Sequence, residues 1–354
     1  MINEKTSKLY LHATNVHQGG GKALLTALLA AAPKAIPMVA CLDRRMSVAP
    51  NLPKNLKVEY VKPSILQRLQ AEWRLARTSR PNDIILCFGN LPPLFRPAGR
   101  VQVFLQNRYL IDDVPLRDFP LKVRVRLWVE RFWLSVRLGN VDAFIVQTTT
   151  MKRLLLAHTK GKVPVHVLPF VADPKDYARK NRKHVSDERS RIDFAYVASG
   201  EPHKNHRTLV DAWRLLSKEQ LYPSLKLTLD RRAFPDLCAW IDDQIALHQL
   251  KIFNEGSLSH EVVMQLYFRV DALIYPSSVE SFGLPLIEAR QAGLPILASE
   301  LDYVRDVVDP DESFDSESPV SIARAVKRFM LKEEPPLSLQ SARDFLEFIL
   351  ERAK

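Results

Sequence analysis

Two glutamates, Glu280 and Glu288, bracket a short loop whose composition suits the binding of a phosphorylated ligand. The apolar run 272–275 before them predicts a buried strand, and Pro285 between them suits the first turn of a helix. Gly293 is typical of a helix C-terminal cap, and 295–299 then predicts the next strand. The loop therefore follows the carboxyl end of a strand, where open α/β sheets bind ligands.

The groups of this loop divide into phosphate donors and hydroxyl acceptors. The backbone N–H groups of Ser281, Phe282, Gly283 and Leu284 meet a helix N-terminus, which favours an anion such as phosphate. Each flanking carboxylate can accept hydrogen bonds from two neighbouring hydroxyls of a sugar or ribose. This combination indicates a nucleotide sugar as ligand.

The stretch Glu280-Ser-Phe-Gly-Leu-Pro-Leu-Ile-Glu288 resembles the Glu-x7-Glu signature of retaining glycosyltransferase family 4, and 289–295 is similar to that family too. The resemblance implies an α/β protein of the GT-B fold, with two Rossmann-like domains facing across a cleft. It also implies that Glu288 holds the nucleotide ribose and that Glu280, a catalytic residue, holds the donor sugar. An ordinary strand–helix–strand unit with two solvated glutamates is the alternative interpretation.

A strand at 9–14, the glycines 19–21 and a helix at 22–31 predict the opening unit of a nucleotide-binding fold. Glycine lets a ligand approach the backbone closely, although the spacing fits neither a P-loop nor a dinucleotide fingerprint. Beside the Glu-x7-Glu stretch, the segment resembles the family's N-terminal glycine loop. Gly20 and Gly21 are then expected to face the donor phosphates, and a tight turn without a ligand is the alternative.

A second phosphate contact is expected from Lys204, which follows the predicted strand 192–198 and precedes a helix. An ammonium group at such a junction can meet a diphosphate as a point charge, so Lys204 joins the donor-binding and catalytic candidates. Many members of the family carry an arginine five residues earlier, where this chain has Ser199. The resemblance therefore implies an incomplete cationic clamp, and a solvated loop lysine is the alternative.

The acceptor side is expected after the predicted strand 101–105, where the first sheet opens onto the cleft. The family often has a histidine in this region, but this chain has Gln106 and Asn107. No catalytic histidine is carried over, and Asn107 and Arg108 are candidates for acceptor contact. A plain loop role is the alternative for both, because polar residues are common in loops.

The order of predicted elements divides the chain into four parts. Residues 1–170 are expected to form the acceptor-side Rossmann-like domain, and 171–190, polar and charged, the linker. Residues 191–335 are expected to form the nucleotide-sugar-binding domain. The family resemblance implies that a helix in 336–354 returns towards the first domain.

Charge is concentrated in the first half of the chain. Residues 1–170 carry 26 Lys and Arg against 10 Asp and Glu, a net of +16, whereas the remainder has a net of −5. This asymmetry suggests an anionic partner. Within this basic first half, the segment 121–138 combines basic and aromatic residues: Lys122, Arg124, Arg126, Arg131 and Arg137 with Trp128, Phe132 and Trp133. This combination fits an interfacial helix on an anionic membrane. A helix that packs its apolar face into the core is the alternative.

Other features of the sequence limit the classes of protein and site. No apolar run is long enough for a transmembrane helix, the N-terminus lacks a signal-peptide core, and the three cysteines have no metal-ligand spacing. We therefore expect a cytoplasmic enzyme, peripheral on the inner face of the membrane, with no cofactor and no metal. Asp309-Pro-Asp311 has the form of a metal-binding Asp-x-Asp, but its turn-rich setting favours a structural role.

The function expected from the resemblance is transfer of a sugar from a UDP- or GDP-linked donor to a lipid-linked or oligosaccharide acceptor in bacterial surface polysaccharide synthesis. Two alternatives stay open. One is a non-catalytic or epimerase-type GT-B protein. The other is a basic nucleic-acid-binding protein, for which the sequence has no recognised motif, so no nucleic-acid partner is expected.

Overall fold

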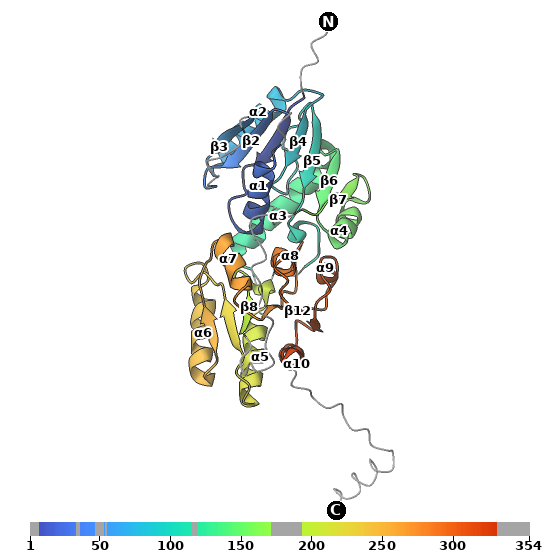
Figure 1. Ribbon diagram of the computed structural model, residues 1–354. Coiled ribbons are helices and arrows are strands. Elements are labelled where there is room, and N and C mark those ends of the chain that lie inside the picture. Colours follow the sequence, from blue (N-terminus) through green and yellow to red (C-terminus); the bar gives the residue numbers. More distant parts are fainter. Residues whose placement is uncertain are drawn as a thin grey trace, which may run out of the picture.

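The structure is a computed structural model that describes residues 7–32, 36–46, 53, 55–114, 116, 119–170 and 193–330. The expected linker, 171–190, and the expected C-terminal helix, in 336–354, lie outside these residues. Figure 1 shows two α/β domains, one above the other.

The first domain is built on a seven-stranded parallel sheet in the order β3-β2-β1-β4-β5-β6-β7. Chain order reverses direction between β1 and β4, which makes this pair the topological switch point of the sheet. The strands are β1 Leu9–Ala13, β2 Met38–Asp43, β3 Leu56–Val61, β4 Ile84–Cys87, β5 Arg100–Phe104, β6 Ala143–Val146 and β7 Val165–Val167.

The described residues of the first domain also form four α-helices and two short 3₁₀ helices: α1 Gly19–Ala30, α2 Ile65–Thr78, α3 Leu121–Val136, α4 Thr149–Thr159, η1 Arg108–Leu110 and η2 Leu138–Asn140. The side chain of Thr148 accepts from the N–H of Met151 and caps α4. Helix α1 already begins at Gly19, so the three glycines form its first turn and not a separate loop before it. Gly19 enters with φ of +63°, a conformation that glycine adopts without strain.

The second domain is built on a six-stranded parallel sheet in the order β10-β9-β8-β11-β12-β13, with its switch point between β8 and β11. Its strands are β8 Asp193–Tyr196, β9 Ser224–Leu227, β10 Ile252–Asn254, β11 Ala272–Tyr275, β12 Ile296–Ser299 and β13 Glu312–Phe314. Its helices are η4 Pro202–Lys204, α5 His206–Lys218, α6 Pro235–His248, α7 His260–Tyr267, α8 Leu284–Gln291, α9 Asp302–Arg305 and α10 Pro319–Phe329.

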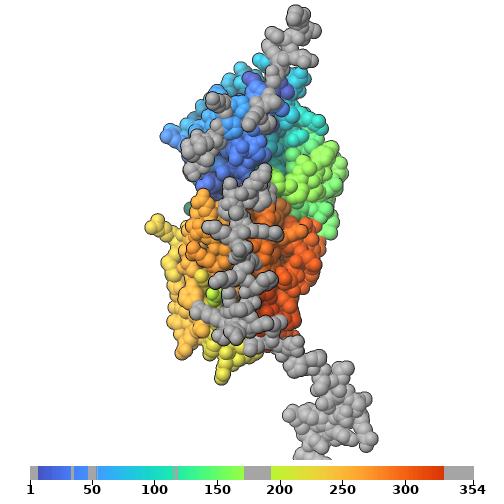
Figure 2. Space-filling view, in the orientation of Figure 1, coloured from blue at the N-terminus to red at the C-terminus, as the bar shows by residue number. Residues whose placement is uncertain are grey.

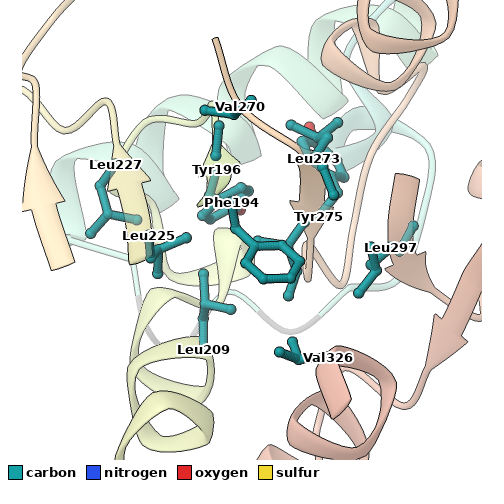
Figure 3. Packing of buried hydrophobic residues seen from close by; sticks show 14 of the residues in the cluster. Phe194, Tyr196, Leu209, Leu225, Leu227, Val270, Leu273, Tyr275, Leu297 and Val326 are labelled. Carbon is teal, nitrogen blue, oxygen red and sulfur yellow. The ribbon is translucent and has the colours of Figure 1, made fainter. Parts of the chain in front are cut away.

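The core of the second domain fixes the strands that carry the Glu280 loop. Phe194 and Tyr275, from neighbouring strands, are buried beside Leu209 of α5 and Val326 of α10 (Figure 3). Strand β11 is buried along its whole length, as its apolar sequence predicted. Because both of its faces are covered, the loop that follows leaves the sheet at a well-defined point.

The two domains contact each other along the carboxyl edges of their sheets, and Figure 2 shows the blue-to-green first domain seated on the yellow-to-red second domain. The hydroxyl of Thr148 donates to the carbonyl of Ser281 at 3.3 Å, which joins the start of α4 to the Glu280 loop. The fold is GT-B, as the sequence indicated. No helix among the described residues is long and apolar enough to cross a bilayer.

Candidate functional site

The loop between β11 and α8 places the predicted phosphate-binding amides at the edge of the second sheet. Gly283 has φ of +70° and begins α8 as its N-cap, with Pro285 in the first turn. A Cβ atom on Gly283 would lie 3.0 Å from Leu286, so the turn has little room for a side chain. Phe282 is buried and anchors the loop, and Leu284 starts the helix. The N–H groups of 281–284 thus lie at a helix N-terminus, which is favourable for an anion.

Glu280 and Lys204 are brought together by the two strands at the switch point. Lys204 Nζ lies 2.5 Å from Glu280 Oε1, and the hydroxyl of Tyr275 donates to the same oxygen at 2.8 Å. Burial alone would raise the pKa of Glu280, but Lys204 outweighs it and holds the pKa below the ordinary range. The carboxylate is therefore ionised at neutral pH and available to accept hydrogen bonds from hydroxyl groups.

The loop after β8 is held to the Glu280 loop by backbone and hydroxyl contacts. The carbonyl of His203 accepts from the N–H of Ser278 at 2.8 Å and from the hydroxyl of Ser277 at 3.1 Å. These bonds position Lys204, the next residue. Ser199, where the family often has an arginine, donates instead to Glu201, and it supplies no cation.

Glu288 occupies a separate, buried position on the inner side of α8. The hydroxyl of Tyr267 donates to Glu288 Oε2 at 3.2 Å, and His260 Nδ1 lies 3.4 Å from Glu288 Oε1. Burial raises the pKa of Glu288 to about 7, although the hydrogen bond from Tyr267 acts in the opposite direction. Burial also lowers the pKa of His260. Sequence reasoning missed Tyr267 and His260 as contacts of Glu288, although their seven-residue spacing places them on one face of α7.

The predicted glycines lie across from the Glu280 loop. A Cβ atom on Gly20 would lie 3.7 Å from Leu284 Cδ2, and one on Gly21 would lie 3.6 Å from Gln106 Oε1. The first turn of α1 therefore faces both the start of α8 and the end of β5. The first turn of α1 is thus within van der Waals reach of the helix that follows the Glu280 loop.

Asn107 and Arg108, the predicted acceptor contacts, lie at the same edge but are engaged within the first domain. The side chain of Asn107 accepts from the N–H of Tyr109 and caps η1, and Arg108 Nε donates to Asp112 at 2.6 Å. Asn90, which sequence reasoning missed, accepts from the N–H groups of Gln106 and Asn107 at 2.6 and 3.0 Å. The role of Asn107 and Arg108 towards an acceptor stays a prediction.

An aromatic contact between the domains also escaped sequence reasoning. The rings of Tyr109 and His203 pack edge to face at 5.4 Å between centroids, and Phe119 stacks on His203 at 6.2 Å. Tyr109 Oη and His203 Nδ1 are buried without a hydrogen-bond partner in the described part of the chain. Burial lowers the pKa of His203 to about 4, with Lys204 acting in the same direction, so the ring is neutral. A buried polar atom without a partner is a candidate for contact with a ligand.

A polar contact at α4 holds the domains together beside the site. Asp306, the C-cap residue of α9, accepts from the N–H of Thr150 at 2.9 Å and from the hydroxyl of Thr149. Arg153 forms an ion pair of 2.5 Å with Asp302. Asp306 thus lies at the N-terminus of a helix from the other domain, where the helix dipole stabilises a negative charge.

The residues of Asp309-Pro-Asp311 have protein partners. Asp309 pairs with Arg305, and Asp311 Oδ2 accepts from the N–H of Ile296 at 2.8 Å. Both carboxylates therefore stabilise the surroundings of β12 and α9. Within the described residues, no group of three or more His, Cys, Asp or Glu side chains is arranged to hold a metal ion.

The second domain, which carries most of this site, is similar in sequence to known glycosyl transferases. The family model of glycosyl transferases group 1 matches residues 177–343. The serotype-specific mannosyltransferase WbdA of Escherichia coli is 32% identical over 139 residues, which span 39% of this chain but only 17% of the relative. The O-antigen chain mannosyltransferase RfbU of Salmonella typhimurium is 26% identical over 266 residues, 70% of each chain.

Solved structures share the architecture at low sequence identity. The sucrose-phosphate synthase of Thermosynechococcus elongatus aligns with a TM-score of 0.66 at 15% identity, over 92% of this chain and 90% of that one. Anabaena HepE, solved in complex with UDP and glucose, aligns with a TM-score of 0.63 at 14% identity, over 92% and 90%. The group 1 glycosyl transferase model thus matches residues 177–343, and the two described domains have the GT-B fold.

Proposed function

We propose that this protein is a retaining glycosyltransferase that moves a sugar from a UDP- or GDP-linked donor to a saccharide acceptor. The observation that carries the proposal is the arrangement of Glu280, Lys204 and Glu288 at one sheet edge, opposite Gly20 of the other domain. The match to the group 1 family supports it.

Each group has a role that follows from its charge and position. The diphosphate binds at the N–H groups of 281–284, with Lys204 adding a positive charge beside it. The hydroxyls of the donor sugar bind to Glu280, and those of the ribose to Glu288. In this arrangement the ammonium group of Lys204 donates one hydrogen bond to Glu280 and another to a phosphate oxygen.

In the proposed reaction, the bond between the sugar's anomeric carbon and the diphosphate oxygen breaks, and a bond to the acceptor oxygen forms on the same face. The electron pair of the broken bond stays on the diphosphate. The acceptor hydroxyl gives its proton to a diphosphate oxygen, so no protein base takes part. The amides and Lys204 stabilise the charge that develops on the leaving group, which is usually a large catalytic contribution.

The names of the relatives guide the choice of substrates. The matched relatives include a serotype-specific mannosyltransferase and O-antigen chain mannosyltransferases, so mannose is the first donor sugar to test. We propose a lipid-linked or oligosaccharide acceptor in bacterial surface polysaccharide synthesis, reached from the cytoplasmic side of the membrane. No metal or other cofactor is required in this proposal.

A non-catalytic sugar-binding protein of the same fold is the second candidate. Ser199 favours it, because the donor diphosphate then meets one cation where many family members offer two. The two candidates differ in turnover: the binder holds a nucleotide sugar without releasing free nucleotide in the presence of any acceptor.

Nucleotide release from GDP- and UDP-sugars, with undecaprenyl-linked and free saccharide acceptors, tests the proposal. Glu288→Gln should raise the donor KM by about tenfold to a hundredfold, because ribose contacts hold ground and transition states alike. Glu280→Gln should also lower kcat, since it touches the reacting sugar. Asp243→Asn, an exposed position on α6, is the matched control. If the protein binds a donor but shows no turnover with any of these acceptors, the second candidate is favoured.

A further inference from the structure

Helices α2 and α3 of the first domain expose apolar residues in an unusual concentration. Ten of the twenty large apolar residues that are exposed in the described chain lie on these two helices. On α3 they are between 46% and 70% exposed: Leu121, Val125, Trp128, Val129, Phe132 and Val136. On α2 they are between 37% and 82% exposed: Ile65, Leu66, Leu69 and Trp73. Patches of this kind mark a partner surface.

The exposed residues of each helix form a stripe that points away from the core. On α3 the positions 121, 125, 128, 132 and 136 recur every three or four residues and share one face. The buried residues of α3, Leu127 and Leu134, lie on the opposite face. On α2, Ile65, Leu69 and Trp73 recur every four residues, and Ala71 and Leu75 are buried on the other side. Each helix is therefore apolar both towards the core and towards the outside.

The two helices lie side by side, because both bind the same turn between β4 and β5. Glu72 of α2 accepts from the N–H of Leu94 at 2.9 Å, and Trp133 of α3 donates to the carbonyl of Pro92 at 3.0 Å. The right-handed crossovers from β3 to β4 and from β5 to β6 place both helices on the same side of the sheet. Their exposed stripes thus belong to one continuous face, which we call the α2–α3 face.

The charges around this face are of one sign. The two acidic residues on these helices, Glu72 and Glu130, are buried and half-buried on the inner side. The cations at the edge of the apolar stripes are exposed, among them Arg77, Lys122 and Arg124. No carboxylate within the described residues pairs with Lys122 or Arg124. Arg77 lies over the ring of Trp73 at 4.2 Å. Exposed tryptophan and phenylalanine between basic side chains match the boundary between lipid headgroups and acyl chains.

From this geometry we infer that the α2–α3 face docks on an anionic membrane, with the apolar stripes of both helices inserted at the interface. The cations bind headgroup phosphates, while Trp128 and Phe132, stacked at 6.2 Å, enter the region below. Charge complementarity favours lipid over a protein partner, since an anionic leaflet supplies negative charge to Lys122 and Arg124, whereas Arg126 already lies 3.8 Å from Glu130.

The structure corrects one part of the membrane surface that the sequence predicted. Arg131 is turned inwards and donates to the carbonyls of Tyr109 and Asp112, each at 2.8 Å. It therefore connects α3 to the residues beside the candidate site and does not serve as a lipid anchor. If the proposed function is right, this connection places the mouth of the site next to the bilayer, where a lipid-linked acceptor lies.

Flotation of the full-length protein with lipid vesicles tests the inference without donor or acceptor, so it is independent of the proposed function. The wild type should float with phosphatidylcholine vesicles that contain phosphatidylglycerol and stay behind with phosphatidylcholine alone. Lys122→Gln with Arg124→Gln should weaken binding by about thirtyfold, the factor expected for two cations at an anionic leaflet. Lys218→Gln with Arg232→Gln, exposed cations of the second domain, should leave binding unchanged.

The two helices are tested separately through their apolar residues. Trp128→Ser with Phe132→Ser and Ile65→Ser with Trp73→Ser should each weaken vesicle binding by at least about tenfold. Leu247→Ser with Phe253→Ser, exposed apolar residues of the second domain, is the matched control. A wild type that ignores anionic vesicles at low salt would overturn the inference. So would apolar variants that bind as before, or that only turn a dimer into a monomer in sedimentation, which would make the face a contact between copies.

Discussion

Lys204 and Glu280 form an ion pair of 2.5 Å, although 76 positions separate them in the chain. They meet because β8 and β11 are neighbours at the centre of the second sheet, and each residue lies on the loop that follows its strand. Both side chains are nearly buried. Each charge therefore depends on the other, and a substitution at one position leaves the other uncompensated.

This dependence separates a structural from a catalytic role. Glu280→Gln should lower the free energy of unfolding by about 3 kcal/mol, because Lys204 is left buried without its partner. Lys204→Met combined with Glu280→Gln should recover most of that stability and none of the transfer activity. Urea unfolding and nucleotide release measure the two effects. Recovery of both together would show that the pair acts on the fold alone.

Glu288 should make stability depend on pH. Its pKa is raised from 4.5 to about 7 in the folded protein, mainly by burial, so the folded state keeps a proton that the unfolded chain has lost. The free energy of unfolding should therefore fall as pH rises from about 4.5 to 7 and then level off. Glu288→Gln should remove this contribution. Thermal unfolding across this range provides the measurement, and identical pH profiles for mutant and wild type would contradict the assignment.

The same residue should link donor binding to a proton. If ionised Glu288 accepts from the ribose hydroxyls, binding releases a proton below pH 7, and nucleotide affinity should rise by up to about tenfold per pH unit up to that point. Glu288→Gln should give a flat profile, with its largest loss of affinity at pH 7 and above, where the wild-type carboxylate is ionised. Asp243→Asn, an exposed position on α6 away from the site, serves as the control. A wild-type affinity that does not change between pH 5.5 and 7 on titration calorimetry would argue against ribose at Glu288.

The parts of this protein that sequence predicted well are those fixed by local chemistry. Pro285 and Gly293 set the ends of α8, and Gly293 has φ of +66°, as its cap position requires. The apolar run 272–275 became a strand buried along its whole length. These features depend on neighbours within a few residues, so one sequence is enough to predict them.

What the sequence did not predict depends on pairing between distant segments. The contact of Tyr109 with His203 needs the relative placement of two domains, which no local pattern records. Arg131 shows the same limit. Its sequence neighbours suggested a lipid contact, but its carbonyl partners, Tyr109 and Asp112, lie in η1 and in the loop that follows it. The apolar residues of α2 recur at helical spacing, but only their burial in the structure shows which face of the helix is exposed.

Chelation should leave activity intact, since the diphosphate is expected to meet Lys204 and the start of α8. Turnover in EDTA should stay within about twofold of the untreated enzyme, an estimate based on a leaving group neutralised by protein groups alone. Loss of activity that Mg²⁺ or Mn²⁺ restores would contradict this. Asp309→Asn and Asp311→Asn would then show whether either carboxylate is involved, after allowance for their structural contacts.

Substitutions of Asp306 and Asp302 compare two contacts between the domains, a carboxylate at a helix N-terminus and an exposed ion pair. Asp306→Asn should cost about 1 kcal/mol of stability, because the carboxylate accepts from Thr150 at a helix N-terminus. Burial would raise the pKa of Asp306, but its bonds to Thr149 and Thr150 outweigh this and lower it, so its contribution should be lost below about pH 3.8. Asp302→Asn removes an exposed pair with Arg153 and should cost less than about 0.5 kcal/mol. Urea unfolding of both variants measures the difference; equal losses would contradict it.

Tyr109 should contact the acceptor through its hydroxyl. Its Oη is buried without a partner in the described chain, beside His203 and next to the Lys204–Glu280 pair. Tyr109→Phe keeps the ring packing and removes only the hydroxyl, so the donor KM and the melting temperature should stay unchanged. The acceptor KM should rise by about twofold to tenfold, the factor expected for one neutral hydrogen bond. Tyr222→Phe, an exposed tyrosine of the second domain, is the control. If Tyr109→Phe raises the melting temperature and leaves the acceptor KM unchanged, the ring serves only to join the two domains.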